Sequence, residues 1–167
     1  MSRAFPRAAQ AAAVLVLAGL LWLAAMAGAA AACATPANAQ ALREGLGQAV
    51  NAERRSAGLA PLAVSRRLTR AAQGHACSIA RRDRVTHRGT LGAGLRLRLT
   101  RVGYHAAIAN ENLAMGLDSP AAAVAGWMGS PHHRANLLSA ETRDFGAGIA
   151  QGTDGRIYWV AISARHR

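Results

Sequence analysis

Three side chains in this sequence carry the chemistry of a metal or acid–base site: His87, Glu111 and His133. Two imidazoles and one carboxylate are ligands for a divalent transition metal, with coordination positions left open for water. The three residues are 24 and 22 positions apart, so only the fold can bring them together. The sequence lacks G-x-S-x-G, H-E-x-x-H and G-x-x-x-x-G-K motifs, which removes the common templates for nucleophilic, zinc-protease and phosphate-loop chemistry.

Hydrophobic spacing and capping residues predict the helices around these side chains. Apolar residues at helical spacing predict helices over 40–56 and 66–82, the second of them capped by Ser65. Ser119-Pro120 begins another helix, and Ser130-Pro131 begins a short one that has His133 in its first turn. The positive end of a helix disfavours imidazolium, so we expect the His133 ring to be neutral.

The last third of the chain changes to a period of two. Residues 145–150 and 156–164 alternate as strands do, and the turn Thr153-Asp154-Gly155 between them predicts a hairpin. The segment 108–115, which contains Glu111, is ambiguous between helix and strand. Helices followed by strands predict an α+β domain.

The amino terminus is typical of a secretory signal peptide. Arg3 and Arg7 precede an uninterrupted apolar stretch at 14–23, and small residues follow up to Ala32. We therefore divide the chain into a signal peptide over 1–32, a tether over 33–40 and one domain over 41–167. A retained membrane anchor is the alternative, although the alanine-rich second half of the apolar run would insert weakly, and no stable membrane span is expected after cleavage.

The two cysteines, Cys33 and Cys77, leave two interpretations open. Cys33 follows the alanine run and is either a lipid-modified cysteine or one end of a disulfide to Cys77. Ala30 stands three residues before Cys33, where lipid attachment favours a large aliphatic residue. An exported protein meets oxidising conditions, which favours the disulfide.

Several segments together resemble the CAP superfamily of secreted proteins, also called the SCP domain. The resemblance is carried by Glu111-Asn112-Leu113-Ala114, by the run from Trp127 to Leu138, by Thr86-His87-Arg88-Gly89, by Val50-Asn51-Ala52-Glu53-Arg54 and by the closing hairpin. It implies a three-layer α-β-α sandwich with helices on a small antiparallel sheet. It also implies a cleft with a His-Glu-Glu-His set, in which His87, Glu111 and His133 match and Ser130 replaces the second glutamate.

The resemblance implies a secreted or periplasmic protein, and we expect a binding module more than an enzyme. The expected cleft comprises His87, Glu111, Asn112, Ser130 and His133, and its ligand would be small and apolar or anionic, such as a lipid or a cell-envelope polymer. Zinc or another divalent cation, weakly bound by the two histidines and Glu111, is the expected cofactor. The alternative activity is a metal-assisted hydrolase or protease in which Glu111 is the general base.

Simpler interpretations stand beside these. Glu111 is alternatively a buried structural carboxylate bonded to the histidines, and His75 is expected to pack in the core of its helix. The arginines at 96, 98 and 101 are expected to form a solvated face. The net charge of +12 does not indicate a nucleic-acid partner, because aromatic residues make up only 4% and lie away from the arginine runs.

Overall fold

The computed structural model describes residues 33–167, so the predicted signal peptide over 1–32 lies outside the described residues. The chain forms helices and strands that alternate along most of its length. In order, they are α2 (Ala39–Ser56), β1 (Ala63–Val64), α3 (Arg66–Arg81), the 3-10 turn η1 (Thr90–Gly92), α4 (Leu95–Arg101), β2 (Ala106–Met115), α5 (Pro120–Met128), α6 (Pro131–Leu137), β3 (Asp144–Gln151) and β4 (Ile157–His166).

The strands form one sheet in the order β1-β3-β4-β2. The predicted hairpin is confirmed as β3 and β4, which pair antiparallel from Asp144 opposite Ala164 to Gln151 opposite Ile157. The ambiguous segment is the edge strand β2, which places Glu111 opposite Ile162 of β4. Strands are therefore not confined to the end of the chain, and the short β1 adds a parallel pair with β3.

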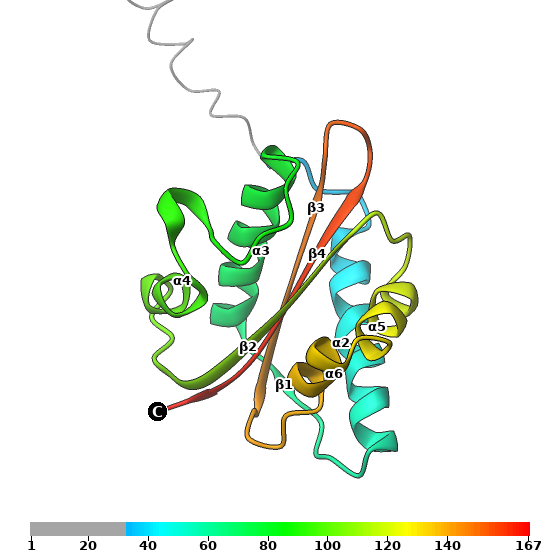
Figure 1. Ribbon diagram of the computed structural model, residues 1–167, viewed down its shortest axis with the longest axis vertical. Coiled ribbons are helices and arrows are strands. Elements are labelled where there is room, and N and C mark those ends of the chain that lie inside the picture. Colours follow the sequence, from blue (N-terminus) through cyan, green and yellow to red (C-terminus); the bar gives the residue numbers. More distant parts are fainter. Residues whose placement is uncertain (1–32) are drawn as a thin grey trace, which may run out of the picture. The chain divides into compact units, whose positions relative to one another are not determined.

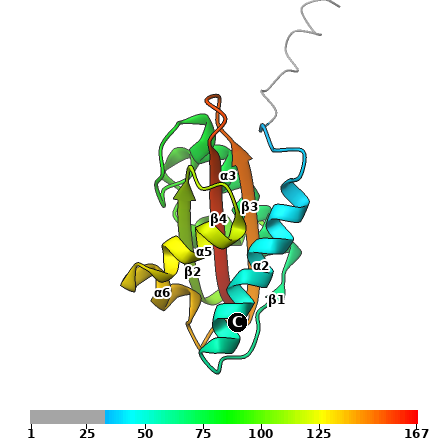
Figure 2. The same cartoon turned by 90° about the vertical axis from the view of Figure 1, so that its right-hand side faces the viewer.

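Helices cover both faces of the sheet, which confirms the α-β-α sandwich (Figures 1 and 2). Helices α3 and α4 lie on one face, and α2, α5 and α6 lie on the other. Each face has its own apolar core. Leu68 and Ile79 of α3 belong to the first, whereas Trp127 of α5 and Trp159 of β4 belong to the second.

Two glycines of β3 let α3 rest on the sheet at backbone distance. A Cβ atom at Gly146 would lie 2.3 Å from the main chain of Leu68, and one at Gly148 would lie 2.2 Å from that of Ala72. Any side chain at these positions would push the helix away. The close approach fixes how far α3 stands from β2 and from the residues that β2 carries.

The amino-terminal tether is bonded to α3 and to the outer side of β3. The predicted disulfide between Cys33 and Cys77 is confirmed. The Gln73 side chain donates to the carbonyl of Ile149 at 2.7 Å and accepts from the N–H of Ile149 at 3.1 Å. These are the two hydrogen bonds that a neighbouring strand would make with Ile149. Gln151 donates its N–H to the carbonyl of Ala34 at 2.8 Å.

Candidate functional site

Glu111 is the centre of the site and is buried, with 5% of its surface exposed. It lies in the middle of β2, where successive side chains point to opposite faces of the sheet. Glu111 points toward α3 and α4, because its partners come from that face. Asn110 and Asn112 contact α6 on the other face, since Asn112 donates to the carbonyl of His133 at 2.9 Å and Asn110 donates to that of Asn136.

His87 is brought to Glu111 as the sequence predicts. Its Nδ1 lies 2.9 Å from Glu111 Oε1, whereas 62% of its side chain is exposed. The hydrogen bond to the carboxylate raises the pKa of His87 above its usual value, against the opposing effect of burial. One edge of the ring is therefore tied to the site, and the ring carries a positive charge more readily than a free histidine does.

Arg98 of α4 is the main partner of Glu111, and it corrects the sequence interpretation of this residue. Its guanidinium contacts both carboxylate oxygens, with Nη2 3.0 Å from Oε1 and Nη1 2.8 Å from Oε2. Arg98 is not part of a solvated face, because only 8% of its surface is exposed. Position 98 lies on the same helical stripe as Leu95, Leu99 and Val102. The spacing of these apolar residues could therefore have indicated from the sequence that Arg98 is buried.

His75 of α3 completes the buried group on this face. It is 1% exposed, and its Nε2 lies 2.9 Å from the carbonyl of Thr86 and 3.9 Å from Glu111 Oε1. Burial lowers the pKa of His75, the charge of Arg98 lowers it further, and Glu111 raises it, so the net shift is downward. The expected core position is confirmed, but the Nδ1 atom has no hydrogen-bond partner among residues 33–167.

The charge of Glu111 is stable at neutral pH. Burial alone would raise the pKa of this carboxyl, but hydrogen bonds from His87 and Arg98, together with the charge of Arg98, lower it below the usual value. An ionised carboxylate whose two oxygens are both occupied by a guanidinium is a structural ion pair. Its position in the interior and its bond to His87 match part of the simpler interpretation of Glu111; the partner besides His87 is Arg98, and not His133.

The main chain of His133 is bonded to β2 on the α6 side of the strand. His133 is in the first turn of α6 as predicted, and its carbonyl is bonded to Asn112. Burial lowers the pKa of His133, and the charges of His132 and His87 lower it further, which agrees with the expected neutral ring. Ser130 precedes α6 at the capping position, but its side chain makes no capping hydrogen bond.

The expected three-ligand metal set is not assembled in this structure. Within residues 33–167, no group of three or more His, Cys, Asp or Glu side chains lies close enough to hold a metal ion. The physical reason is that Arg98 occupies the Glu111 carboxylate. The donors that remain are the rings of His87 and His133, which do not fit a zinc site of three protein ligands.

Comparison with known proteins identifies the family. The model of the cysteine-rich secretory protein family, called CAP, matches residues 48–163, which is more than half of the chain. The chain belongs to this family. The CAP resemblance drawn from the sequence is thereby confirmed.

Relatives of this CAP chain occur in bacteria. It is 27% identical to the Bacillus subtilis protein YkwD over 117 residues, which are 70% of this chain and 45% of YkwD. It therefore spans less than half of that relative.

Solved structures agree with the fold. An outer surface protein of Borrelia burgdorferi has a TM-score of 0.73 and 19% identity, and the match covers 81% of this chain and 100% of that one. An extracellular SCP-domain protein of Bacillus anthracis has a TM-score of 0.68 and 25% identity, over 75% of this chain and 41% of the other. The first likeness concerns the fold alone, and the second links this CAP domain to an extracellular protein.

None of the helices within residues 33–167 combines the length and the apolar character that crossing a membrane requires. The sulfur of Cys33 is engaged in the disulfide with Cys77, and a sulfur bonded in this way does not also carry a lipid thioether.

Proposed function

We propose that this CAP protein is an exported binding module, and that its ligand is small, anionic and partly apolar. The proposed contact surface is formed by the rings of His87 and His133 at the edge of β2. The proposal rests on the Arg98–Glu111 ion pair. This pair occupies the only carboxylate of the site, so that carboxylate is not free to bind a metal or to accept a proton. What remains accessible is a pair of imidazoles on a strongly basic protein.

The ion pair argues against the hydrolase alternative. A general base must accept a proton from water near the working pH, and it works best when its pKa lies near that pH. The pKa of Glu111 is shifted in the opposite direction, and Arg98 contacts both of its oxygens. Glu111 therefore orients the His87 ring and stabilises its charge, and an acidic ligand would meet that ring.

Export is supported by independent observations. A disulfide joins Cys33 to Cys77, and such bonds persist in oxidising compartments. The family is one of secretory proteins, and the Bacillus anthracis relative is described as extracellular. A secreted or periplasmic protein with a net charge of +12 would meet anionic lipids and envelope polymers.

Calorimetric titration of the full chain with dodecanoate tests the proposal, since this probe joins an acidic group to an apolar chain. His133→Ala and His87→Ala should each weaken binding by about tenfold, the usual effect of losing a charge-assisted hydrogen bond. His132→Ala is the matched control, because His132 is the exposed neighbour of His133, and it should change the affinity by less than about twofold. Equal losses at 132 and 133 would contradict the assigned surface.

Two further experiments test for metal binding and for hydrolase activity. With zinc chloride as the probe, binding by the imidazole pair alone would be weak, would disappear in His133→Ala and would persist in Glu111→Gln. Loss of zinc binding in Glu111→Gln would restore the three-ligand prediction. Hydrolysis of an ester or peptide by the parent that is abolished in Glu111→Gln would overturn the binding-module proposal.

A further inference from the structure

The segment of residues 84–97, which joins α3 to α4 and contains η1, exposes apolar side chains to solvent. Leu91 is 95% exposed, and Leu97 and Val85 are 48% and 41% exposed. In Figure 1, α4 and the turn before it stand at the left margin of the described residues, on the side of the sheet that α3 covers. Single exposed leucines are common on protein surfaces, but several apolar side chains exposed by one short segment indicate a contact surface.

Leu91 also has a backbone conformation that leucine rarely adopts. Its φ of 56° and ψ of 31° lie in the left-handed region, and Asp83 is the only other non-glycine residue within 33–167 that has a positive φ. Steric contact between the Cβ atom and the main chain disfavours this region. Burial does not offset the strain, because the side chain lies in water. Strained residues are concentrated at functional sites, so the Leu91 side chain indicates a contact outside this chain.

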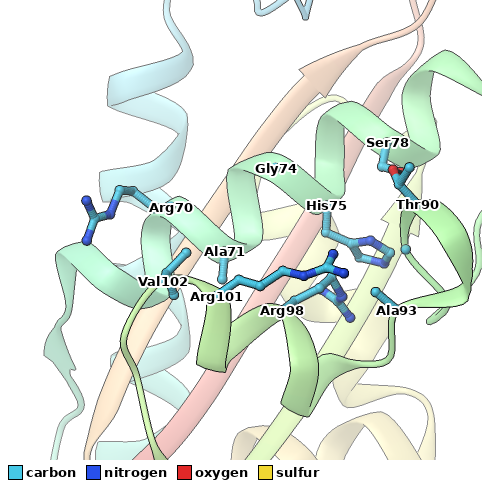
Figure 3. A pocket seen from close by; sticks show the side chains of 11 residues that line it. Arg70, Ala71, Gly74, His75, Ser78, Thr90, Ala93, Arg98, Arg101 and Val102 are labelled. Atoms are coloured by element: carbon cyan, nitrogen blue, oxygen red, sulfur yellow. Dashed lines mark hydrogen bonds between the residues drawn. The ribbon is translucent and has the colours of Figure 1, made fainter.

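The turn that presents Leu91 is bonded to α3. Figure 3 shows Thr90 beside Ser78 of α3, and their hydroxyl oxygens are 3.0 Å apart. Arg82, directly after α3, donates to the carbonyl of Gly89 at 3.4 Å. The exposure of Leu91 is therefore a property of the folded domain, because hydrogen bonds on the side of α3 hold the turn that carries it.

The charges of the 84–97 segment have one sign. Arg84, Arg88 and Arg96 are exposed, and none of them is in an ion pair within the described part of the chain. The segment itself contains no Asp or Glu. The carboxylates that precede and follow it along the chain, Asp83 and Glu111, are themselves paired with arginines. The segment is therefore complementary to a negatively charged surface.

We propose that the 84–97 segment docks this protein on a lipid bilayer that carries anionic headgroups. The arginines bind the headgroups, and Leu91 enters the boundary between headgroups and acyl chains. The apolar core of a protein interface is depleted of charge, whereas the apolar side chains here alternate with arginines along the segment. A soluble polyanion would contact the arginines but would gain nothing from Leu91. The proposal does not depend on the ligand of the His87–His133 surface.

Cosedimentation of the exported protein with vesicles of phosphatidylcholine and phosphatidylglycerol tests the proposal. Each variant is compared with the parent at the same amino terminus, so any contribution of residues 1–32 cancels. Leu91→Ser should weaken binding by about tenfold, because it removes the side chain that leaves water on docking. Val64→Ser is the matched control, since Val64 is 76% exposed and lies outside the segment, and it should change binding by less than about twofold.

Two outcomes of this comparison would overturn the proposal. Equal weakening by Leu91→Ser and Val64→Ser would mean that any exposed apolar side chain contributes in the same way. Undiminished binding of Leu91→Ser would assign the arginines to soluble polyanions. Leu91→Gly separates contact from folding, because glycine adopts the left-handed region without strain. It should bind vesicles as weakly as Leu91→Ser without lowering the midpoint of urea unfolding, and a lowered midpoint would show that Leu91 serves the fold.

Charge is tested in the same assay. Arg88→Gln should weaken vesicle binding by about fivefold, the contribution of one arginine near an anionic bilayer. Arg55→Gln at the exposed end of α2 is the control, and equal weakening by both would mean that net charge alone drives binding. Vesicles of phosphatidylcholine alone should bind at least about tenfold more weakly, and equal binding to them would contradict the assignment.

The dodecanoate titration keeps this proposal apart from the proposed function. Leu91→Ser should leave dodecanoate binding within about twofold of the parent, and His133→Ala should do the same for vesicle binding, because the two contacts use different side chains. Loss of both kinds of binding in Leu91→Ser would show one shared surface and would overturn the docking proposal.

Discussion

Residues 33–167 bury two arginines, and the two differ in what accepts their hydrogen bonds. Arg54 of α2, 1% exposed, donates to three main-chain carbonyls, those of Ala60, Leu137 and Ser139, at 2.8–3.0 Å. Arg98 of α4 donates to a carboxylate and keeps one nitrogen unpaired. The first arginine joins loops that are far apart in sequence, and its role is structural. Arg98 pairs instead with the Glu111 carboxylate of the candidate site. The acceptor of a buried arginine therefore distinguishes a structural arginine, which binds main-chain carbonyls, from one that belongs to the site.

The largest effect is expected at Arg54. Arg54→Met leaves three main-chain carbonyls without their donor, the one of Leu137 buried and the other two partly so, and should lower the free energy of unfolding by roughly 4 kcal/mol. Because every acceptor belongs to the main chain, no second side-chain substitution should restore the stability. Urea denaturation measures the change, and a loss below about 1 kcal/mol would mean that water replaces the guanidinium.

A somewhat smaller effect is expected at Arg98, and it should be reversible. Arg98→Met leaves the Glu111 charge buried without its main partner and should cost roughly 3 kcal/mol. The double variant Arg98→Met/Glu111→Gln removes that charge and should recover more than half of the loss. Strictly additive losses in the double-mutant cycle would show that the two side chains act independently, and the contrast with Arg54 would fail.

The smallest effect concerns how the free energy of unfolding falls at acid pH. The folded-state pKa of Glu111 is lowered, so its contribution is complete above the unfolded value of about 4.3 and is lost as the pH falls through the folded value. Glu111→Gln should therefore flatten the fall in stability below about pH 4.3. The exposed Glu141→Gln is the control, and a similar flattening there would refute the assignment. Arg54→Met should shift the whole curve without changing this slope.

The sequence predicts elements better than it predicts contacts between them. Ser65 and Ser119 cap their helices as expected, because capping depends on a few neighbouring residues. The hairpin follows from local alternation and a turn. The pairing of His87 with Glu111 was implied by the family resemblance, and the disulfide by the presence of a second cysteine.

What sequence reasoning missed depends on how α4 docks. Three arginines occur in and around Leu95–Arg101, and only the contact of this helix with β2 decides which one is buried. Within residues 33–167 the expected three-ligand set is not assembled, and sequence reasoning could not foresee this for a related reason. A strand alternates its side chains between two faces, so Glu111 and the neighbours that contact α6 are separated by β2, and this could not be known while the segment was ambiguous.

The bond between Cys33 and Cys77 has a consequence for how this protein behaves among copies of itself. An open sheet margin invites a strand from another molecule, and β1 covers only the first two residues of β3. Gln73 and Ala34 bond three more main-chain groups beyond it, the carbonyl and the N–H of Ile149 and the N–H of Gln151. Because the disulfide anchors Cys33, the residue next to Ala34, reduction is expected to free Ala34 from this margin. An oxidising environment, which keeps this disulfide formed, is therefore expected to limit pairing of β3 with another copy of the chain.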